Sequence, residues 1–295
     1  MNFADIDHLL GNKKVSLAIC MPEEVDSITA AYEASKLGFV NCIFVGNIEI
    51  MQQFIDKCAP GFKPEMIDAK TPEEAAFKTV ELIRLGKAKA LMKGNISTPI
   101  LLKAVLNSET GIKDSSVLSH VLVYEANDSL RFLTDGGMIP LPTLENKIEI
   151  IKNACKIAKK FGCNPVKVGI LSAAELVNTK IQSSLDAAVL AKMSDQGFFG
   201  DDCIVDGPFG LDNVISEEAA KIKHVKKKFE GNADVMVCAD IDTGNIVGKS
   251  ILYYGNTRAG GMIIGAKCPV ILLSRADTKE IRLDSIKLAL AAGNH

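Results

Sequence analysis

Short apolar runs alternate with longer segments of helical periodicity along the chain, and this alternation limits the fold more than any other feature. The runs that have the composition and length of strands are 15–20, 41–46, 89–94, 120–126, 131–137, 166–173, 203–208, 233–240 and 268–274. Strands that alternate with helices are typical of parallel sheets whose crossover connections are helices. The sequence therefore predicts an α/β protein.

The predicted strands are continuous apolar runs rather than strict alternations of apolar and polar residues. This pattern is expected where helices cover both faces of a sheet. The segments between the runs are amphipathic; in 143–162, for example, Thr143 can cap the first turn and Gly162 can end the last. Ligands of such sheets bind beyond the carboxyl ends of the strands, so the residues that follow each strand are the candidates for chemistry.

The chain is long enough for two domains. It has 295 residues, of which 47% are hydrophobic and none is Trp, so its cores must be built from aliphatic side chains. Residues 120–137 resemble two adjacent strands of a hairpin, which interrupts the alternation of strand and helix. We expect the chain to cross from one domain to the other in this region.

Charge and hydropathy exclude several classes of partner. The formal net charge is −2, from 34 basic and 36 acidic residues, so no global field attracts nucleic acid or an anionic membrane. The first residues lack the pattern of a signal peptide, and no apolar run is long enough to span a bilayer. These features predict a cytoplasmic protein whose anion sites, if any, are local.

The eight cysteines are scattered and form no C-x-x-C motif. They are Cys20, Cys42, Cys58, Cys155, Cys163, Cys203, Cys238 and Cys268. Most lie in or beside apolar runs, where a free cysteine behaves as a small hydrophobic residue. The sequence therefore predicts neither a metal site nor a disulfide framework.

Five predicted strands are followed by segments of similar composition, with glycines, small hydroxyl-bearing residues and isolated charged residues. The segments are 92–98, 134–143, 205–213, 239–249 and 273–280. Glycine lets the backbone approach a ligand closely, and the start of a following helix offers free N–H groups to an anion. Each segment alone is also compatible with an ordinary loop or helix cap. Together they favour a site for a charged ligand.

These segments carry a family resemblance. LMKGNISTPILLKAVL, TDGGMIPLPTLENKIEIIKNA, DGPFGLDNVIS, DIDTGNIVGKSILYYG and VILLSRADTKE, in this order, resemble the phosphate acetyltransferase and phosphate butyryltransferase family. The resemblance runs from about residue 15 to the end of the chain. The compact chain and the motifs GPFGLDN and SRADTKE look closer to the butyryltransferases than to the acetyltransferases.

The resemblance implies a specific architecture. The family has two α/β domains with mostly parallel sheets flanking a cleft that holds the active site, a fold related to isocitrate and isopropylmalate dehydrogenases. Transferred to this chain, the first domain is residues 1–125 plus 259–295, and the second is residues 126–258. A homodimer or larger homo-oligomer is also implied.

The implied reaction interconverts a short-chain acyl-CoA, here butyryl-CoA, plus phosphate with acyl phosphate plus CoA. It needs no metal or other cofactor, and the CoA thiol attacks the acyl phosphate directly. A phosphate acetyltransferase and a non-catalytic acyl-CoA-binding protein on the same fold are the alternatives. A metal-dependent dehydrogenase is disfavoured because no G-x-G-x-x-G follows a predicted strand.

The resemblance places Ser274 and Arg275 on the family's catalytic Ser-Arg pair. Arg275 would hold phosphate with a planar guanidinium, and Ser274 would donate a hydrogen bond to phosphate or to the developing oxyanion. A carboxylate would take the proton of the thiol, whose pKa is about 8.5 in isolation. Asp277 and Asp284 both remain candidates for this base, because the local spacing departs from the family's pattern.

Substrate contacts are implied in three further loops. The residues expected to contact phosphate, acyl phosphate or CoA are Lys93, Gly94, Thr98, Asp135, Thr243, Gly244, Asn245 and Lys249. Helix capping is the alternative for the group that starts at Thr243, and a shaped turn between the domains is the alternative for Asp135. For Arg258 an ion pair at the surface is the favoured interpretation.

Overall fold

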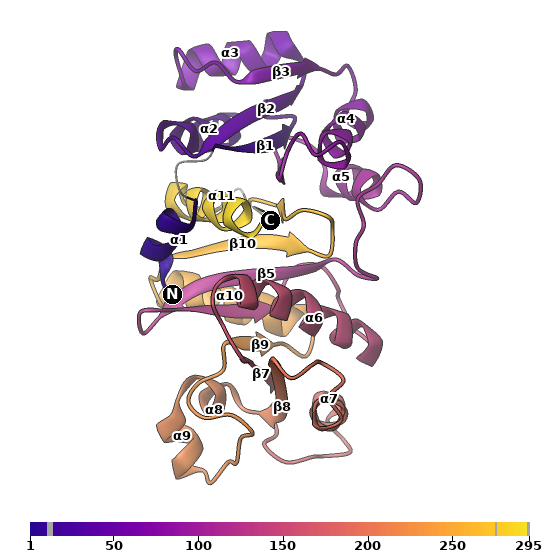
Figure 1. Cartoon of the computed structure of the whole chain (residues 1–295), viewed down its shortest axis with the longest axis vertical. Coiled ribbons are helices and arrows are strands. Elements are labelled where there is room, and N and C mark those ends of the chain that lie inside the picture. Colours follow the sequence, from indigo (N-terminus) through magenta and orange to yellow (C-terminus); the bar gives the residue numbers. More distant parts are fainter. Residues whose placement is uncertain (11–13, 275, 294–295) are drawn as a thin grey trace. The chain divides into compact units, whose positions relative to one another are not determined.

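The computed structural model describes residues 1–10, 14–274 and 276–293 (Figure 1). These residues group into two compact units. Unit 1 consists of Met1–Asn2 and Ser119–Thr257, and unit 2 consists of Phe3–Leu118 and the chain from Arg258 onwards. The chain therefore crosses between the units at 2/3, 118/119 and 257/258, whereas the sequence predicts crossings at 125/126 and 258/259.

Unit 2 contains six strands and six helices among its described residues. The strands are β1 (Val15–Cys20), β2 (Val40–Gly46), β3 (Glu65–Asp68), β4 (Ala90–Lys93), β10 (Ala259–Ile264) and β11 (Val270–Ile271). The helices are α1 (Phe3–Leu10), α2 (Val25–Lys36), α3 (Ile48–Cys58), α4 (Pro72–Arg84), α5 (Thr98–Val105) and α11 (Lys279–Gly293).

The strand order of unit 2 is β3-β2-β1-β4-β11-β10, and every pair is parallel except β10 with β11. The chain first builds outward from β1 through β2 to β3 and then returns to place β4 on the other side of β1. Because crossover connections are right-handed, α2 and α4 cover opposite faces of this sheet. The order therefore reverses between β1 and β4, which is where open α/β sheets bind ligands.

Unit 1 contains five strands and five helices among its described residues. The strands are β5 (Ser119–Ala126), β6 (Ser129–Thr134), β7 (Val166–Leu171), β8 (Cys203–Phe209) and β9 (Val235–Val237). The helices are α6 (Leu144–Lys160), α7 (Gln182–Asp195), α8 (Leu211–Ile215), α9 (Glu217–Ile222) and α10 (Ile241–Tyr254).

The sheet of unit 1 has the order β5-β6-β9-β7-β8 and is parallel except for the β5–β6 pair. That pair is the hairpin that the sequence predicts, and its turn residues Asn127 and Asp128 both have positive φ, at 51° and 57°. Two such residues suit the tight turn that joins adjacent antiparallel strands. The prediction of an α/β protein with mostly parallel sheets is confirmed in both units.

Local signals set several element boundaries. Thr143 caps α6 by accepting from the backbone of Asn146, whose side chain accepts in return from the backbone of Thr143. This reciprocal pair stabilises the first turn. Thr71 caps α4 in a similar way, and Pro72 supplies the fixed φ that suits the first turn.

Two strands are absent from the sequence-based prediction. β3 is short, and its residues are exposed or half-buried at the sheet edge, so no apolar run marks it. β10 begins with Ala259, Gly260 and Gly261, which are poor strand formers in isolation. Gly260 is required because a Cβ atom there would lie 2.7 Å from the backbone nitrogen of Ser285 in α11.

No helix in the described ranges is both long and apolar enough to cross a membrane. The cores are mainly aliphatic, as the composition predicts, with a few buried phenylalanines. Leu17, Ile19, Phe44, Leu91 and Met92 are fully buried in unit 2, and Phe132 stacks on Phe161 in unit 1 at a centroid distance of 6.2 Å.

A buried ion pair joins two helices of unit 1. The ammonium of Lys147 in α6 lies 2.6 Å from the Asp186 carboxylate in α7, and both side chains are almost inaccessible to solvent. Gln182 donates a second hydrogen bond to the same carboxylate. Because a buried charge is costly without its partner, the two residues depend on each other.

We predict that Lys147→Ala lowers the free energy of unfolding by about 3 kcal/mol, since it leaves the Asp186 carboxylate buried without its cation. Lys152→Ala is the matched control, because Lys152 pairs with Glu149 at the exposed surface of the same helix. The control should stay within about 0.5 kcal/mol of wild type. Urea denaturation measures both, and equal losses in the two variants would contradict the assignment.

Candidate functional site

A pocket of about 250 Å³ lies at the point in unit 2 where the strand order reverses. Its walls come from the segments that follow β1, β4 and β11, together with one side chain of α11. The lining residues are Glu24, Asp26, Ser27, Lys93, Gly94, Asn95, Ile96, Ser97, Leu273, Ser274 and Arg282. The structure therefore brings together three of the predicted residues, Lys93, Gly94 and Ser274.

Glycine is needed at position 94 because two backbones meet there. A Cβ atom on Gly94 would lie 2.2 Å from the carbonyl oxygen of Met21, far inside contact distance. The N–H of Gly94 donates to the Cys20 carbonyl at 2.8 Å, and the N–H of Asn95 donates to the Met21 carbonyl. The turn after β4 is thus fastened directly to the turn after β1.

Lys93 ends β4 at the edge of the pocket. Its ammonium donates to the carbonyl oxygen of Gly94 at 3.1 Å, and it has no carboxylate partner among the described residues. Ser97 is the N-cap of α5 but makes no side-chain capping bond, and the predicted residue Thr98 follows as the first helical residue. The lysine and the start of α5 can therefore both meet an anion.

The segment after β11 forms a tight turn that is held by its own side chains. The Ser274 N–H donates to Oδ2 of Asp277 at 2.7 Å, and the Ala276 N–H donates to Oγ of Ser274. The other oxygen of Asp277 has no partner among the described residues. Arg275, the second member of the predicted Ser-Arg pair, lies outside the described residues.

Arg282 belongs to this pocket although sequence reasoning missed it. Its guanidinium lies 2.8 Å from the Asp26 carboxylate and within 3.5 Å of the Ser274 carbonyl oxygen, and the side chain is buried. The hydrogen bond from Arg282 holds the pKa of Asp26 below its usual range. The signal that the sequence offers is an arginine on a buried helix face. The packing of α11 is needed to show which strand ends this arginine adjoins.

Asp284, the second candidate base, lies away from the pocket lining and is fully engaged. Nε of Arg258 donates to one carboxylate oxygen at 3.1 Å, and Nη2 donates to the other at 2.6 Å. Asp284 is buried, whereas the Arg258 side chain is 46% exposed and lies over the Phe3 ring. The ion pair expected for Arg258 is present, and it ties the start of β10 to α11.

In unit 1, the loop after β6 is organised around Asp135. One oxygen of this buried carboxylate accepts from the backbone N–H groups of His120, Gly137 and Met138, and the other accepts from Ile139, all at 2.9 to 3.1 Å. A carboxylate with four backbone donors is strongly held. Asp135 thus shapes the turn through its own side chain.

This loop packs against the first turn of α10, which contains Thr243, Gly244 and Asn245. A Cβ atom on Gly244 would lie 2.4 Å from the Asp135 carbonyl oxygen, and the Asn245 amide donates to the Gly136 carbonyl at 3.3 Å. The Thr243 N–H and hydroxyl both donate to the N-cap residue Asp240, whose pKa is lowered mainly by the backbone hydrogen bond. Lys249 lies further along α10 and is exposed.

Comparison with known proteins agrees with the resemblance seen in the sequence. The family model described as "Phosphate acetyl/butaryl transferase" matches residues 49–290. The chain belongs to this family. A phosphate butyryltransferase of Clostridium acetobutylicum is 40% identical over 96% of this chain and 94% of the relative, and a phosphate acetyltransferase of Thermotoga maritima is 36% identical over 94% of each.

Solved structures agree with the family assignment. A branched-chain phosphotransacylase from Enterococcus faecalis V583 has a TM-score of 0.84 and 31% identity, and the match covers 95% of this chain and 99% of that chain. A phosphotransacetylase from Streptococcus pyogenes has a TM-score of 0.83 at 20% identity, which shows the shared fold. The chain is accordingly an acyltransferase of this family with an α/β fold.

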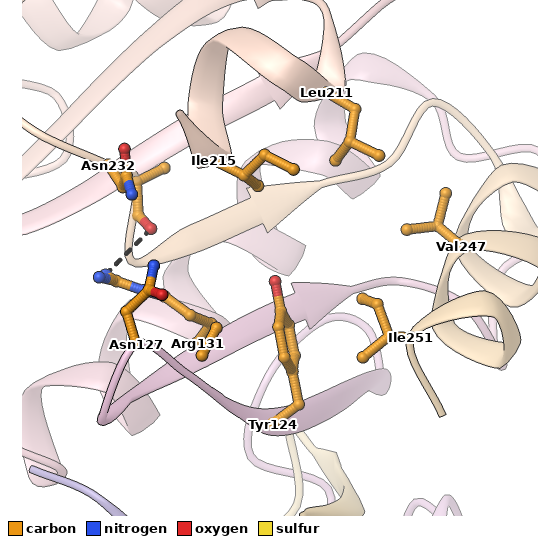
Figure 2. Close-up of a pocket in the computed structure, with 10 residues that line it drawn as sticks. Tyr124, Asn127, Arg131, Leu211, Ile215, Asn232, Val247 and Ile251 are labelled. Atoms are coloured by element: carbon orange, nitrogen blue, oxygen red, sulfur yellow. Dashed lines mark hydrogen bonds between the residues drawn. The ribbon is translucent and has the colours of Figure 1, made fainter. Parts of the chain in front are cut away.

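Unit 1 has a cavity of its own, also of about 250 Å³, which lies near the β5–β6 turn and the start of β9 (Figure 2). Its lining is mainly apolar and comes from the hairpin, α8 and α10: Tyr124, Ala126, Asn127, Arg131, Leu211, Ile215, Asn232, Ala233, Val247 and Ile251. Asp135 follows the other end of β6. The cavity is therefore separate from the Asp135 loop, although Val247 and Ile251 in its lining belong to α10, the helix that carries the other predicted residues of this unit.

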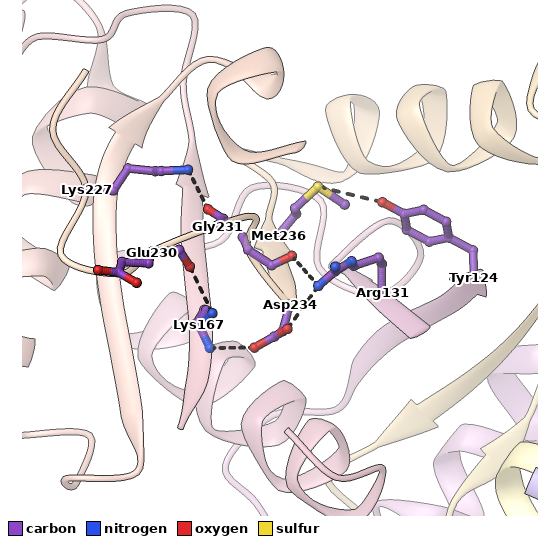
Figure 3. Close-up of polar contacts among 9 residues, drawn as sticks. Tyr124, Arg131, Lys167, Lys227, Glu230, Gly231, Asp234 and Met236 are labelled. Carbon is purple, nitrogen blue, oxygen red and sulfur yellow. Dashed lines mark hydrogen bonds and ion pairs between the residues drawn. The ribbon is translucent and has the colours of Figure 1, made fainter. Parts of the chain in front are cut away.

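The charged residues beside that cavity are engaged in holding the strands together (Figure 3). Arg131 of β6 donates to the Asp234 carboxylate at 3.0 Å and to the Ala233 carbonyl at 3.2 Å. Asp234 also accepts from the backbone of Lys167 in β7, and the Lys167 ammonium donates to the Glu230 carbonyl. These contacts serve the fold.

We predict that Gly244→Ala lowers the free energy of unfolding by about 2 kcal/mol, since the new methyl group would collide with the Asp135 backbone. Gly248→Ala on the same helix is the matched control, because its Cβ would make an ordinary 3.4 Å contact with Leu122. Thermal or urea unfolding measures the difference. A Gly244→Ala protein as stable as the control would refute this close packing.

Proposed function

We propose that this chain transfers a short acyl group, with butyryl preferred, between CoA and phosphate. Membership of the phosphate acyltransferase family supports the general reaction. The observation that carries the proposal is the pocket at the strand-order reversal of unit 2, where Lys93, Ser274 and Arg282 converge. We assign this pocket to the phosphate group, with Arg275 as a further contact implied by the family resemblance.

The pocket provides complementary groups for phosphate. The Lys93 ammonium is available for an anion because its partner is a neutral carbonyl, and the start of α5 adds the positive end of a helix dipole. The hydroxyls of Ser97 and Ser274 add donors for the phosphate oxygens. Such fixed donors also stabilise the negative charge that develops on the leaving phosphate and on the carbonyl oxygen.

Written toward acyl-CoA, the reaction begins when the CoA thiol loses its proton and attacks the acyl carbonyl. The sulfur–carbon bond forms, the carbon–oxygen bond to phosphate breaks, and phosphate leaves with the bonding pair. We assign Asp277 as the base. One of its carboxylate oxygens accepts from the Ser274 N–H, and the other has no partner among the described residues and can accept the thiol proton. Asp284 is a weaker candidate because Arg258 occupies both of its oxygens.

The preference for butyryl rests on relatives at moderate identity. Phosphate butyryltransferases of two Clostridium species are 40% and 38% identical to this chain, and the Thermotoga maritima acetyltransferase is 36% identical. The Enterococcus faecalis structure is described as a branched-chain phosphotransacylase. We therefore propose a four-carbon acyl group, linear or branched, with acetyl as the alternative.

We predict that CoA is released from butyryl-CoA or isobutyryl-CoA only when phosphate is present, and that EDTA leaves the rate unchanged because the proposed transfer uses no metal. Thiol release from acetyl-, propionyl-, butyryl- and isobutyryl-CoA, measured with and without phosphate, tests this. The acyl series is compared by kcat/KM. Each methylene that fits an apolar pocket is worth roughly a tenfold change or more.

Three results would change the proposal. A maximum at acetyl-CoA would replace butyryl by acetyl, and loss of activity with EDTA would contradict the metal-free reaction. Folded protein that binds CoA but releases no thiol from any of the four substrates would favour the non-catalytic alternative.

A second prediction separates the two candidate bases. In the direction of acyl-CoA formation, Asp277→Asn should lower kcat roughly 10²-fold or more with little change in stability, because it removes the proton acceptor. Asp284→Asn should instead lower the free energy of unfolding by about 2 kcal/mol, because it weakens the paired hydrogen bonds with Arg258. Steady-state kinetics and urea unfolding of both variants provide the measurements.

The assignment of the base changes if the two variants show the opposite effects on kcat and on stability. Full activity in Asp277→Asn would remove this residue from the mechanism. A stable Asp284→Asn protein with a large loss of kcat would make Asp284 the base.

A further inference from the structure

Two cysteines meet in the interior of unit 1, far from each other in the sequence. The Sγ atoms of Cys155 in α6 and Cys203 at the start of β8 lie 2.8 Å apart, although 48 residues separate them along the chain. Both residues are buried, and both are free thiols. A disulfide has a sulfur–sulfur distance of about 2.05 Å, so the sulfurs need to approach by less than 1 Å to form a bond.

A cation and an exposed carboxylate lie close to this pair in the structure. Lys159 lies one turn after Cys155 in α6 and forms a 2.6 Å ion pair with Asp202, the residue before Cys203. Asp202 is exposed and belongs to a turn that leads into β8. Cys203 is therefore buried itself but directly follows an exposed residue.

The two thiols are unlike in acidity. The hydrogen bond with the Cys155 thiol lowers the pKa of Cys203 against the effect of burial, and the nearby Lys159 ammonium lowers it further. The pKa of Cys155 is raised, mainly by its hydrogen bond with Cys203. The first proton is thus lost from Cys203, which makes this sulfur the nucleophile of the pair.

We propose that Cys155 and Cys203 form an oxidant-sensitive dithiol that closes to a reversible disulfide linking α6 to β8. The oxidant is hydrogen peroxide. The Cys203 thiolate attacks one peroxide oxygen, the oxygen–oxygen bond breaks, and a sulfenic acid and one water form once the leaving oxygen is protonated. The Cys155 sulfur then attacks the sulfenic sulfur, the sulfur–sulfur bond forms, the sulfur–oxygen bond breaks, and the hydroxide leaves with the Cys155 thiol proton as a second water.

The other six cysteines lack this arrangement. All lie in the described ranges, and none makes a hydrogen bond with a second thiol. Cys163 is the useful comparison because it follows the same helix and is less buried than the pair. Burial still raises the pKa of Cys163 to about 11, so it is a poor nucleophile near neutral pH. Proximity therefore singles out Cys155 and Cys203, independently of the proposed acyl transfer.

Peptide mapping of the full-length protein tests the proposal. The protein is treated with hydrogen peroxide, remaining thiols are alkylated in denaturant, and the sample is digested with trypsin without reduction. The expected product is peptide 153–156 joined to peptide 193–221, with the loss of two hydrogen atoms. Dithiothreitol should separate the two peptides, and in wild type the linked product should form before Cys163 is oxidised.

Three variants make the test specific. Cys155→Ser and Cys203→Ser should each abolish the linked peptide, whereas Cys163→Ser should form it as readily as wild type. Oxidised wild type should also unfold at a temperature higher by about 5 °C or more than the reduced protein, because the closed loop restricts the unfolded chain. Oxidation of Cys155 or Cys203 to sulfinic acid with no linked peptide, while the untreated protein is folded, would overturn the proposal.

Discussion

The pairing of β11 with β4 is the constraint on which the candidate site depends. Val270 and Ile271 align with Leu91 and Met92, so a segment from the end of the chain becomes an interior strand of the unit 2 sheet. Because this pairing is parallel, the residues after β11 emerge at the same edge as those after β1 and β4. Ser274 thus reaches the segment that begins at Lys93, and α11 can place Arg282 behind them.

Most charged groups near the strand ends form hydrogen bonds or ion pairs that hold the backbone in place. Few of them therefore remain to act on a substrate. Asp135 binds four N–H groups of its own turn and the start of β5, Asp240 caps α10, and Asp284 is held by both arms of Arg258. Among the described residues, both oxygens of Asp135 and of Asp284 accept hydrogen bonds, whereas the two bonds to Asp240 end on Oδ1 alone. Of the predicted carboxylates, Asp277 has one oxygen without a partner in the described part of the chain, which is why the proposed mechanism uses it.

Sequence periodicity was sufficient for most of the fold but not for its edges. The continuous apolar runs located β1, β2 and β4, because central parallel strands are buried on both faces. The periodicity did not reveal β3, because a strand at the sheet edge needs few apolar residues. It also did not reveal β10, whose glycines are explained only by the approach of α11. Local capping at Thr143 was readable because the cap and its partner are three residues apart.

The candidate site was only partly readable for a related physical reason. Lys93, Gly94 and Ser274 stand directly after strands, so the rule for open α/β sheets leads to them. Arg282 lies within a helix, and its relevance arises from a contact with Asp26, 256 residues earlier in the chain. That contact also changes the electrostatics: Arg282 is already neutralised by Asp26, whereas Lys93 donates to a neutral carbonyl. An incoming phosphate would therefore gain its main new ion pair from Lys93 among the described lining residues, while Arg282 would chiefly keep the Asp26 charge from opposing it.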